Sequence, residues 1–195
     1  IIGCGYWGSI VINCIKNLKK VKEIYIYDED PDKVNIIKKR FGDSVKIINF
    51  KDISNNNNIN FLYLATPPSK NLKLIQKILP LNKNILLEKP GFSKVNEFKI
   101  VKKELKKTKS KLRFGYIYLY HDYIKKLKKI INKKDFGKIK HIKFQRQNFG
   151  PIRNDVNAFT DLATHDLSIL KFLFKKKIEL KNYTKHNVLR HKSGD

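Results

Sequence analysis

The sequence predicts an α/β protein built on a doubly wound parallel sheet. Short apolar runs alternate with longer amphipathic ones between residues 3 and 115, which is typical of strands joined by crossover helices. A glycine pattern G-x-G-x-x-G opens the chain, and an acidic residue ends the next apolar run. After residue 115 the rhythm changes. We therefore expect a dinucleotide-binding domain at 1–117, with its first strand truncated, and the first part of an α+β substrate and oligomerisation domain at 118–195.

The strands of the first domain are predicted from short runs rich in β-branched and aromatic residues. Apolar residues recur at helical spacing between these runs. One such helix has Pro31 near its start and Gly42 at its end, and two others open on a serine that can cap them. The predicted strands are 23–28, 45–49, 61–66, 84–88 and 111–116, and the predicted helices are one after the glycine pattern and those at 31–42, 69–79 and 93–107.

The second domain is expected to begin with an amphipathic helix at 121–134, in which Asp122 would be the cap. A long lysine-rich strand is predicted at 137–149, and a helix with a strongly apolar face at 159–174. Because a parallel sheet and a second sheet-based domain would both be incomplete, the sequence resembles a fragment that could be inert by itself.

The net charge of +26 comes mainly from lysines scattered along the chain. Specific readers of phosphate and bases rely on arginine forks, and only five arginines are present. We therefore expect a solvated lysine coat and no nucleic-acid partner, with a DNA-binding protein as the weaker alternative. No apolar run reaches the length needed to span a bilayer, so no membrane partner is expected. Two cysteines without zinc or disulfide spacing favour a cytoplasmic protein without a metal.

The opening glycines have the spacing of a dinucleotide-binding turn. Gly3 would make the tight turn, Gly5 would let a pyrophosphate approach the backbone, and Gly8 would allow helix and strand to pack closely. Asp28 follows Gly8 by 20 residues (28 − 8), the separation expected for the acid that binds the adenosine ribose. Two further acids follow Asp28, and their charge would repel a 2′-phosphate. NAD is therefore favoured over NADP, and a glycine turn without a ligand is the alternative.

Three more stretches accompany the glycine turn: A-T-P-P-S-K-N at 65–71, L-L-E-K-P at 86–90 and G-P-I-R-N-D-V-N-A-F-T-D-L-A-T-H-D-L-S-I-L at 150–170. In this order they resemble the glucose-fructose oxidoreductase/inositol dehydrogenase family, Gfo/Idh/MocA. The resemblance implies a two-domain NAD(P)-dependent oxidoreductase with a Rossmann fold that acts on a secondary alcohol of a sugar, cyclitol or nucleotide sugar, as a dimer or tetramer. The last stretch is similar to nucleotide-sugar 3-dehydrogenases of surface-polysaccharide biosynthesis.

The chain departs from the family pattern at three positions. Asn71 stands where the family usually carries His, and Thr160 and Thr164 stand where Trp and Pro are usual. These differences concern the fit of the substrate more than the chemistry.

Oxidation of a secondary alcohol requires a base for the hydroxyl proton while hydride leaves for nicotinamide. His165 is the candidate base, and Asp161, four residues earlier on the same helical face, would orient it. A surface salt bridge is the alternative for an isolated pair of this kind; the resemblance favours the catalytic one. Lys89 lies at the carboxyl end of a predicted strand, where its ammonium would favour alkoxide character in the reacting hydroxyl.

The remaining site residues follow from their places at strand ends and near the glycine turn. Arg153 could bind a phosphate or carboxylate of the substrate or pair with Asp155, and Glu88 could contact the cofactor or have a structural role. A non-catalytic NAD or sugar sensor on the same scaffold is the alternative function. The expected cofactor-binding residues are Gly3, Gly5, Tyr6, Trp7, Gly8, Asp28, Thr66, Pro67, Glu88 and Lys89, and the expected substrate-binding residues are Lys89, Arg153, Asp155, Asn157, Asp161 and His165.

Overall fold

The computed structural model describes residues 1–147, 156–175, 177–179, 181–184 and 186. It consists of two compact units, Ile1–Gly115 and Tyr116–Asp195. The first unit contains all five strands and the second is formed by helices and extended chain in its described part.

The first unit is a parallel sheet. β1 pairs with β2, β3 with β4, and β4 with β5, all in parallel. Ile2 joins the two groups because it bridges Tyr27 on one side and Leu64 on the other. The spatial order is therefore β2-β1-Ile2-β3-β4-β5. Successive strands are added on one side of Ile2 up to β2 and on its other side from β3 onward, although all strands stay parallel. The strands are β1 (Tyr25–Ile26), β2 (Lys46–Ile47), β3 (Phe61–Leu64), β4 (Asn84–Leu87) and β5 (Leu112–Phe114).

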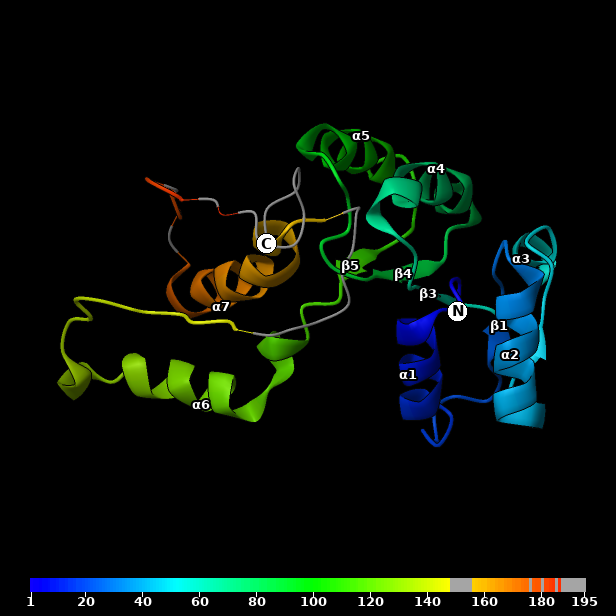
Figure 1. The fold of residues 1–195 in the computed structure, drawn as a ribbon, viewed down its shortest axis with the longest axis horizontal. Helices are drawn as coiled ribbons and strands as arrows, with labels where there is room; N and C mark the ends of the chain where they lie inside the picture. Colours follow the sequence, from blue (N-terminus) through cyan, green and yellow to red (C-terminus); the bar gives the residue numbers. More distant parts are fainter. Residues whose placement is uncertain (148–155, 176, 180, 185, 187–195) are drawn as a thin grey trace. The chain divides into compact units, whose positions relative to one another are not determined.

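Helices cover both faces of this sheet, as in a doubly wound fold (Figure 1). One core joins the inner faces of α3, α4 and α5 to β3 and β4, and the other joins α1 and α2 to β1. Ile24 and Ile26 lie in the second core, whereas Tyr25 and Tyr27 pack against the first, as the twofold repeat of a strand requires. The helices are α1 (Tyr6–Ile15), α2 (Pro31–Phe41), α3 (Asp52–Asn55), α4 (Pro68–Ile78) and α5 (Val95–Leu105), with short 3₁₀ turns η1 (Gly42–Ser44) and η2 (Leu79–Leu81).

The predicted α/β class is confirmed, and several helix ends follow local rules. Asp30 caps α2 by accepting a hydrogen bond from the backbone N–H of Asp32, and Gly42 ends the helix with a φ of 52°. The predicted serine caps are wrong. α4 begins at Pro68 without a side-chain cap, and the α5 start is held by the Glu97 carboxylate, which accepts from the backbone N–H of residues 93 and 94.

In the second unit, α6 begins after His121, whose imidazole Nδ1 accepts a hydrogen bond from the Tyr123 backbone. The expected Asp122 cap is therefore wrong. The strand expected at 137–149 is also absent from its described part, 137–147, since a strand requires a hydrogen-bonded neighbour and no described segment pairs with it. The elements are η3 (Ile117–Tyr120), α6 (Asp122–Ile131), η4 (Lys134–Phe136), the π-helical turn η5 (Phe159–Ala163) and α7 (Thr164–Phe174).

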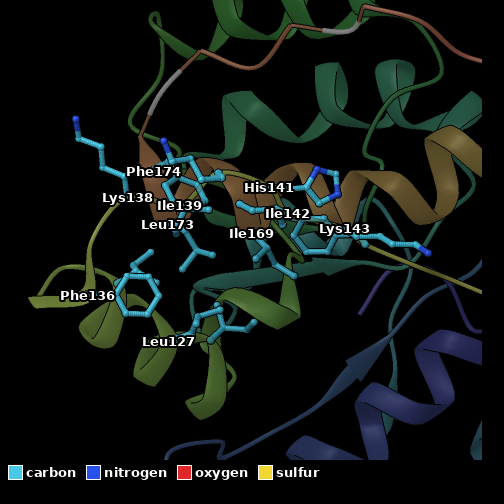
Figure 2. A pocket seen from close by; sticks show the side chains of 14 residues that line it. Leu127, Phe136, Lys138, Ile139, His141, Ile142, Lys143, Ile169, Leu173 and Phe174 are labelled. Carbon is cyan, nitrogen blue, oxygen red and sulfur yellow. The ribbon is translucent and has the colours of Figure 1, made fainter.

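An apolar cavity of about 670 Å³ lies between α6, the segment 136–144 and α7. Figure 2 shows Leu127, Ile139, Ile169 and Leu173 directed toward it. Among the described residues, no helix is long and apolar enough to cross a membrane.

Candidate functional site

The glycine turn has the geometry that the sequence predicts for it. Gly3 has a φ of +103°, and a Cβ there would lie 2.6 Å from the Ala65 carbonyl oxygen. A Cβ at Gly8 would overlap the Gly3 carbonyl oxygen, whereas a Cβ at Gly5 would meet nothing within 4 Å. The first and third glycines therefore allow close packing of the turn, and the second leaves open space beside the start of α1.

The start of α1 is suited to an anion. Gly5 is its N-cap, no side chain caps it, and its first turn has no acidic residue. An uncapped helix start presents backbone N–H groups and the positive end of the helix dipole. The observed cradle thus fits the pyrophosphate of a dinucleotide, and Thr66 lies against it, with Cγ2 3.3 Å from the position of a Cβ on Gly3.

Asp28 is attached to this turn by its own side chain. Its Oδ2 accepts a hydrogen bond of 2.7 Å from the Cys4 backbone N–H, and its Oδ1 accepts one of 3.0 Å from that of Asp30. A carboxylate has about four acceptor positions, so both oxygens can still accept from ribose hydroxyls. The sequence spacing placed the acid, and the two backbone bonds orient it.

The charge around Asp28 is weaker than three acids in a row suggest. Glu29 pairs with Lys70 at 2.6 Å, and Asp30 pairs with Lys33 at 3.1 Å. Three carboxylates and two ammonium groups leave a local charge of −1 (−3 + 2). The expected repulsion of a 2′-phosphate therefore depends mainly on Asp28.

Trp7 and Glu88 are joined through a tyrosine that the sequence analysis missed. The Trp7 indole N–H donates to the Tyr63 hydroxyl at 3.0 Å, and that hydroxyl donates to Glu88 Oε1. Glu88 directly follows β4 and precedes Lys89, which is half-buried and is joined to Pro90 by a cis peptide bond. Glu88 thus has a hydrogen-bonding role toward Tyr63, and Trp7 is anchored to β3.

Asn71 connects the loops that follow β3 and β4. It is fully buried on α4. Its Oδ1 accepts from the Thr66 hydroxyl at 2.5 Å, and its Nδ2 donates to the Gly91 carbonyl at 2.6 Å. Asn71, a residue that departs from the expected family pattern, therefore makes its contacts inside the first unit. Two other expected cofactor residues are exposed: Tyr6, which is the first residue of α1, and Pro67, which lies in the loop after β3.

His165 is buried in the second unit, on the face of α7 that also carries Ile169 and Leu173. Its ring packs edge-on against Tyr118, with centroids 4.9 Å apart and an interplanar angle of 80°. Asp161 lies in the π-helical turn η5, immediately before α7. Turns of this kind occur often at functional sites because they change the direction of side chains along a helix.

Arg146 is a second residue that the sequence analysis missed. Its Nε donates to Asp166 Oδ1 at 2.8 Å, and its guanidinium lies 4.7 Å from the centre of the Tyr118 ring. Tyr118 therefore contacts both a cation and His165. The only sequence signal was the scarcity of arginine in this chain.

Of the other predicted substrate residues, Asn157 belongs to the described part of the chain. Arg153 and Asp155 lie outside the described residues. Asn157, two residues before η5, accepts a hydrogen bond on its Oδ1 from the Thr160 backbone N–H at 2.8 Å. Among the described residues, no group of three or more His, Cys, Asp or Glu side chains could hold a metal ion.

The family model GFO_IDH_MocA, described as an oxidoreductase family with an NAD-binding Rossmann fold, matches residues 1–116. The chain belongs to this family. The oxidoreductase YrbE of Bacillus subtilis, described as uncharacterized, is 20% identical over 187 residues, which cover 91% of this chain and 54% of that protein. The chain spans about half the length of the curated relatives it matches.

Solved structures show the same fold. A putative myo-inositol dehydrogenase from Sinorhizobium meliloti matches with a TM-score of 0.76 at 19% identity, over 90% of this chain and 54% of that one. The WlbA dehydrogenase from Bordetella pertussis, in complex with NADH and UDP-GlcNAcA, matches with a TM-score of 0.73 at 19% identity, over 89% and 54%. The Rossmann architecture and the family predicted from the motifs are thus confirmed.

Proposed function

We propose that this protein is an NAD-dependent dehydrogenase that transfers hydride between nicotinamide and a secondary alcohol of a sugar, cyclitol or nucleotide sugar. The observation that carries this proposal is the open, uncapped start of α1 beside Asp28, whose carboxylate is tied to the glycine turn. Family membership and the NADH complex of the B. pertussis relative support the choice of cofactor. A nucleotide-sugar substrate, a cytoplasmic location, a role in polysaccharide biosynthesis and a homo-oligomer belong to the same proposal.

The residues would divide the work as follows. Bound NAD supplies the hydride acceptor. The glycine turn and the start of α1 would hold the pyrophosphate, and Asp28 would accept hydrogen bonds from the ribose. His165 takes the hydroxyl proton of the substrate, Asp161 orients its imidazole, and the Lys89 ammonium stabilises negative charge on the reacting oxygen.

Gly5→Ala tests the cofactor site with little risk to the fold. Gly5 has an ordinary φ of −78°, and a Cβ there meets no atom of the protein, so the variant should fold as the wild type does. The added methyl would occupy the space left for the pyrophosphate and should weaken NADH binding at least about tenfold, equivalent to about 1.4 kcal/mol. Asn13→Ala, an exposed position on the same helix, is the matched control. Unchanged NADH affinity in Gly5→Ala would contradict the proposed site.

Turnover separates the enzyme from a sensor. With NAD and a panel of sugars, cyclitols and nucleotide sugars, the full-length protein should form NADH, and His165→Asn should reduce its rate by about 10²- to 10⁴-fold. His121→Asn, at the exposed cap of α6, should leave the rate unchanged. NADH binding without turnover on any substrate would favour the non-catalytic sensor.

A further inference from the structure

Tyr63 lies where three parts of the first unit meet. It is on β3, between Leu62 and Leu64, which both belong to the core that β3 and β4 share with α3, α4 and α5. Because side chains alternate along a strand, Tyr63 is directed to the opposite face of the sheet. Its side chain is nearly covered, with 9% exposed, and its hydroxyl contacts both Trp7 and Glu88.

The direction of these hydrogen bonds is determined by the chemistry of the three groups. An indole N–H only donates, an ionised carboxylate only accepts, and a phenol does both. The chain of bonds therefore runs from Trp7 to Tyr63 to Glu88. Burial is the larger cause and the hydrogen bond to Glu88 the next of a pKa of the Tyr63 hydroxyl that lies above its ordinary value. The phenol therefore keeps the proton that it donates at neutral pH. A negatively charged acceptor makes such bonds stronger than neutral ones.

Gly115 provides the space for the carboxylate. A Cβ on Gly115 would lie 2.7 Å from Glu88 Oε1 and 3.1 Å from its Cδ, so the carboxylate lies directly beside the bare Cα. The backbone N–H of Gly115 also donates to the Leu87 carbonyl at 2.8 Å. Glu88 is therefore held between the Tyr63 hydroxyl and the end of β5.

We propose that Tyr63 is a positioning residue that connects the glycine turn to the Glu-Lys-Pro segment. Trp7 lies inside the turn, two residues after Gly5, and Glu88 immediately precedes Lys89. Through Tyr63, the position of α1's first turn and that of the strand end that carries Lys89 depend on each other. The proposal rests on the proposed function for its consequence, which is that cofactor binding and placement of Lys89 are coupled.

The first test needs no cofactor. Trp7 is the only tryptophan, so its emission reports the network directly. Tyr63→Phe removes one oxygen and the acceptor of the indole N–H; we expect a red-shifted emission and about twofold faster quenching by acrylamide, since a buried contact is lost. Tyr25→Phe, on β1, is the matched control, because it removes an exposed hydroxyl that donates to Glu23. Emission and quenching equal to those of the wild type in Tyr63→Phe would overturn the network.

The second test measures NADH binding by energy transfer from Trp7. We expect Tyr63→Phe to weaken NADH binding about tenfold, the loss that corresponds to one hydrogen bond to a charged group. Gly115→Ala should weaken it in the same direction, because the methyl displaces only the flexible end of Glu88. Glu88→Gln combined with Tyr63→Phe should add little to Tyr63→Phe alone, since both act through one bond.

The outcomes separate the two proposals. Independent, additive effects of the substitutions at residues 63 and 88, or NADH affinity unchanged in Tyr63→Phe, would overturn the positioning role. Failure of the wild type to bind NADH would instead contradict the proposed function, and the cofactor-free emission test would then still decide whether the network exists.

Discussion

Replacement of Asn71 should loosen the loops that follow β3 and β4, which carry residues of the proposed cofactor site. The Asn71 amide is fully buried and joins the Thr66 hydroxyl to the Gly91 carbonyl through bonds of 2.5 and 2.6 Å. Asn71→Leu keeps a side chain of similar size and removes both of these hydrogen bonds. Gly91 is buried, so its carbonyl would be left without this donor, whereas the half-buried Thr66 can turn its hydroxyl toward water.

The cost can be worked out from these two contacts. An unsatisfied buried carbonyl costs about 1–3 kcal/mol, and loss of the Thr66 bond costs about 1 kcal/mol. We therefore expect Asn71→Leu to lower the free energy of unfolding of the first unit by about 2–4 kcal/mol. Asn71→His should lose less, because a neutral imidazole also offers one donor and one acceptor.

Urea unfolding followed by Trp7 emission is the appropriate assay. Trp7 lies on α1, so its signal reports the first unit and not the second. A shifted midpoint with an unchanged slope would indicate a change in stability alone. Asn35→Leu, at an exposed position on α2, is the control. If Asn71→Leu shifts the midpoint no more than Asn35→Leu does, the amide does not connect the loops and the reasoning is refuted.

Four further outcomes are expected. Asp28→Gly should reduce the preference for NAD over NADP about tenfold, measured as a ratio of binding constants, because two acids then face two lysines and the net negative charge that repels a 2′-phosphate is lost; an unchanged ratio would contradict the role of this acid. Cys14 should react with a thiol reagent in the folded protein, whereas buried Cys4 should react only after unfolding. Because burial raises the pKa of Cys4 from 9.0 to about 11, the unfolded chain loses a proton that the folded chain keeps, and stability should fall as pH rises from 9 to 11; urea midpoints constant over this range would refute the shift. Arg146→Lys should speed amide hydrogen exchange in α7 about tenfold, because an ammonium cannot both pair with Asp166 and stack on a ring; exchange at the wild-type rate would show that the contact is not needed.

Much of the first unit could be predicted from short-range patterns. The strand segments follow from runs of alternating residues, and the order of strands and helices follows from the right-handed crossovers of a parallel sheet. Gly3, Gly8 and Asp28 were found because close backbone approach and a fixed length of βαβ unit restrict which residue can stand at each position.

Other features required the folded structure. The predicted strand at 137–149 failed over 137–147 because a lysine-rich alternating pattern does not specify a pairing partner. The caps predicted at residues 93 and 122 were wrong because Glu97 and His121 accept hydrogen bonds from the N–H groups at those helix starts. The cap predicted at residue 69 was wrong because α4 already begins at Pro68, without a side-chain cap.

The sequence by itself determined the Rossmann class, the glycine turn and the acidic residue beside it, since each depends on spacing within about 30 residues of chain. Only the tertiary structure decided that Tyr63 joins Trp7 to Glu88, that Asn71 joins two loops, and that Tyr118 contacts both Arg146 and His165. The physical reason is that a hydrogen bond depends on where two side chains meet in space. Trp7 and Tyr63 are 56 residues apart, and no local periodicity in the chain encodes that meeting.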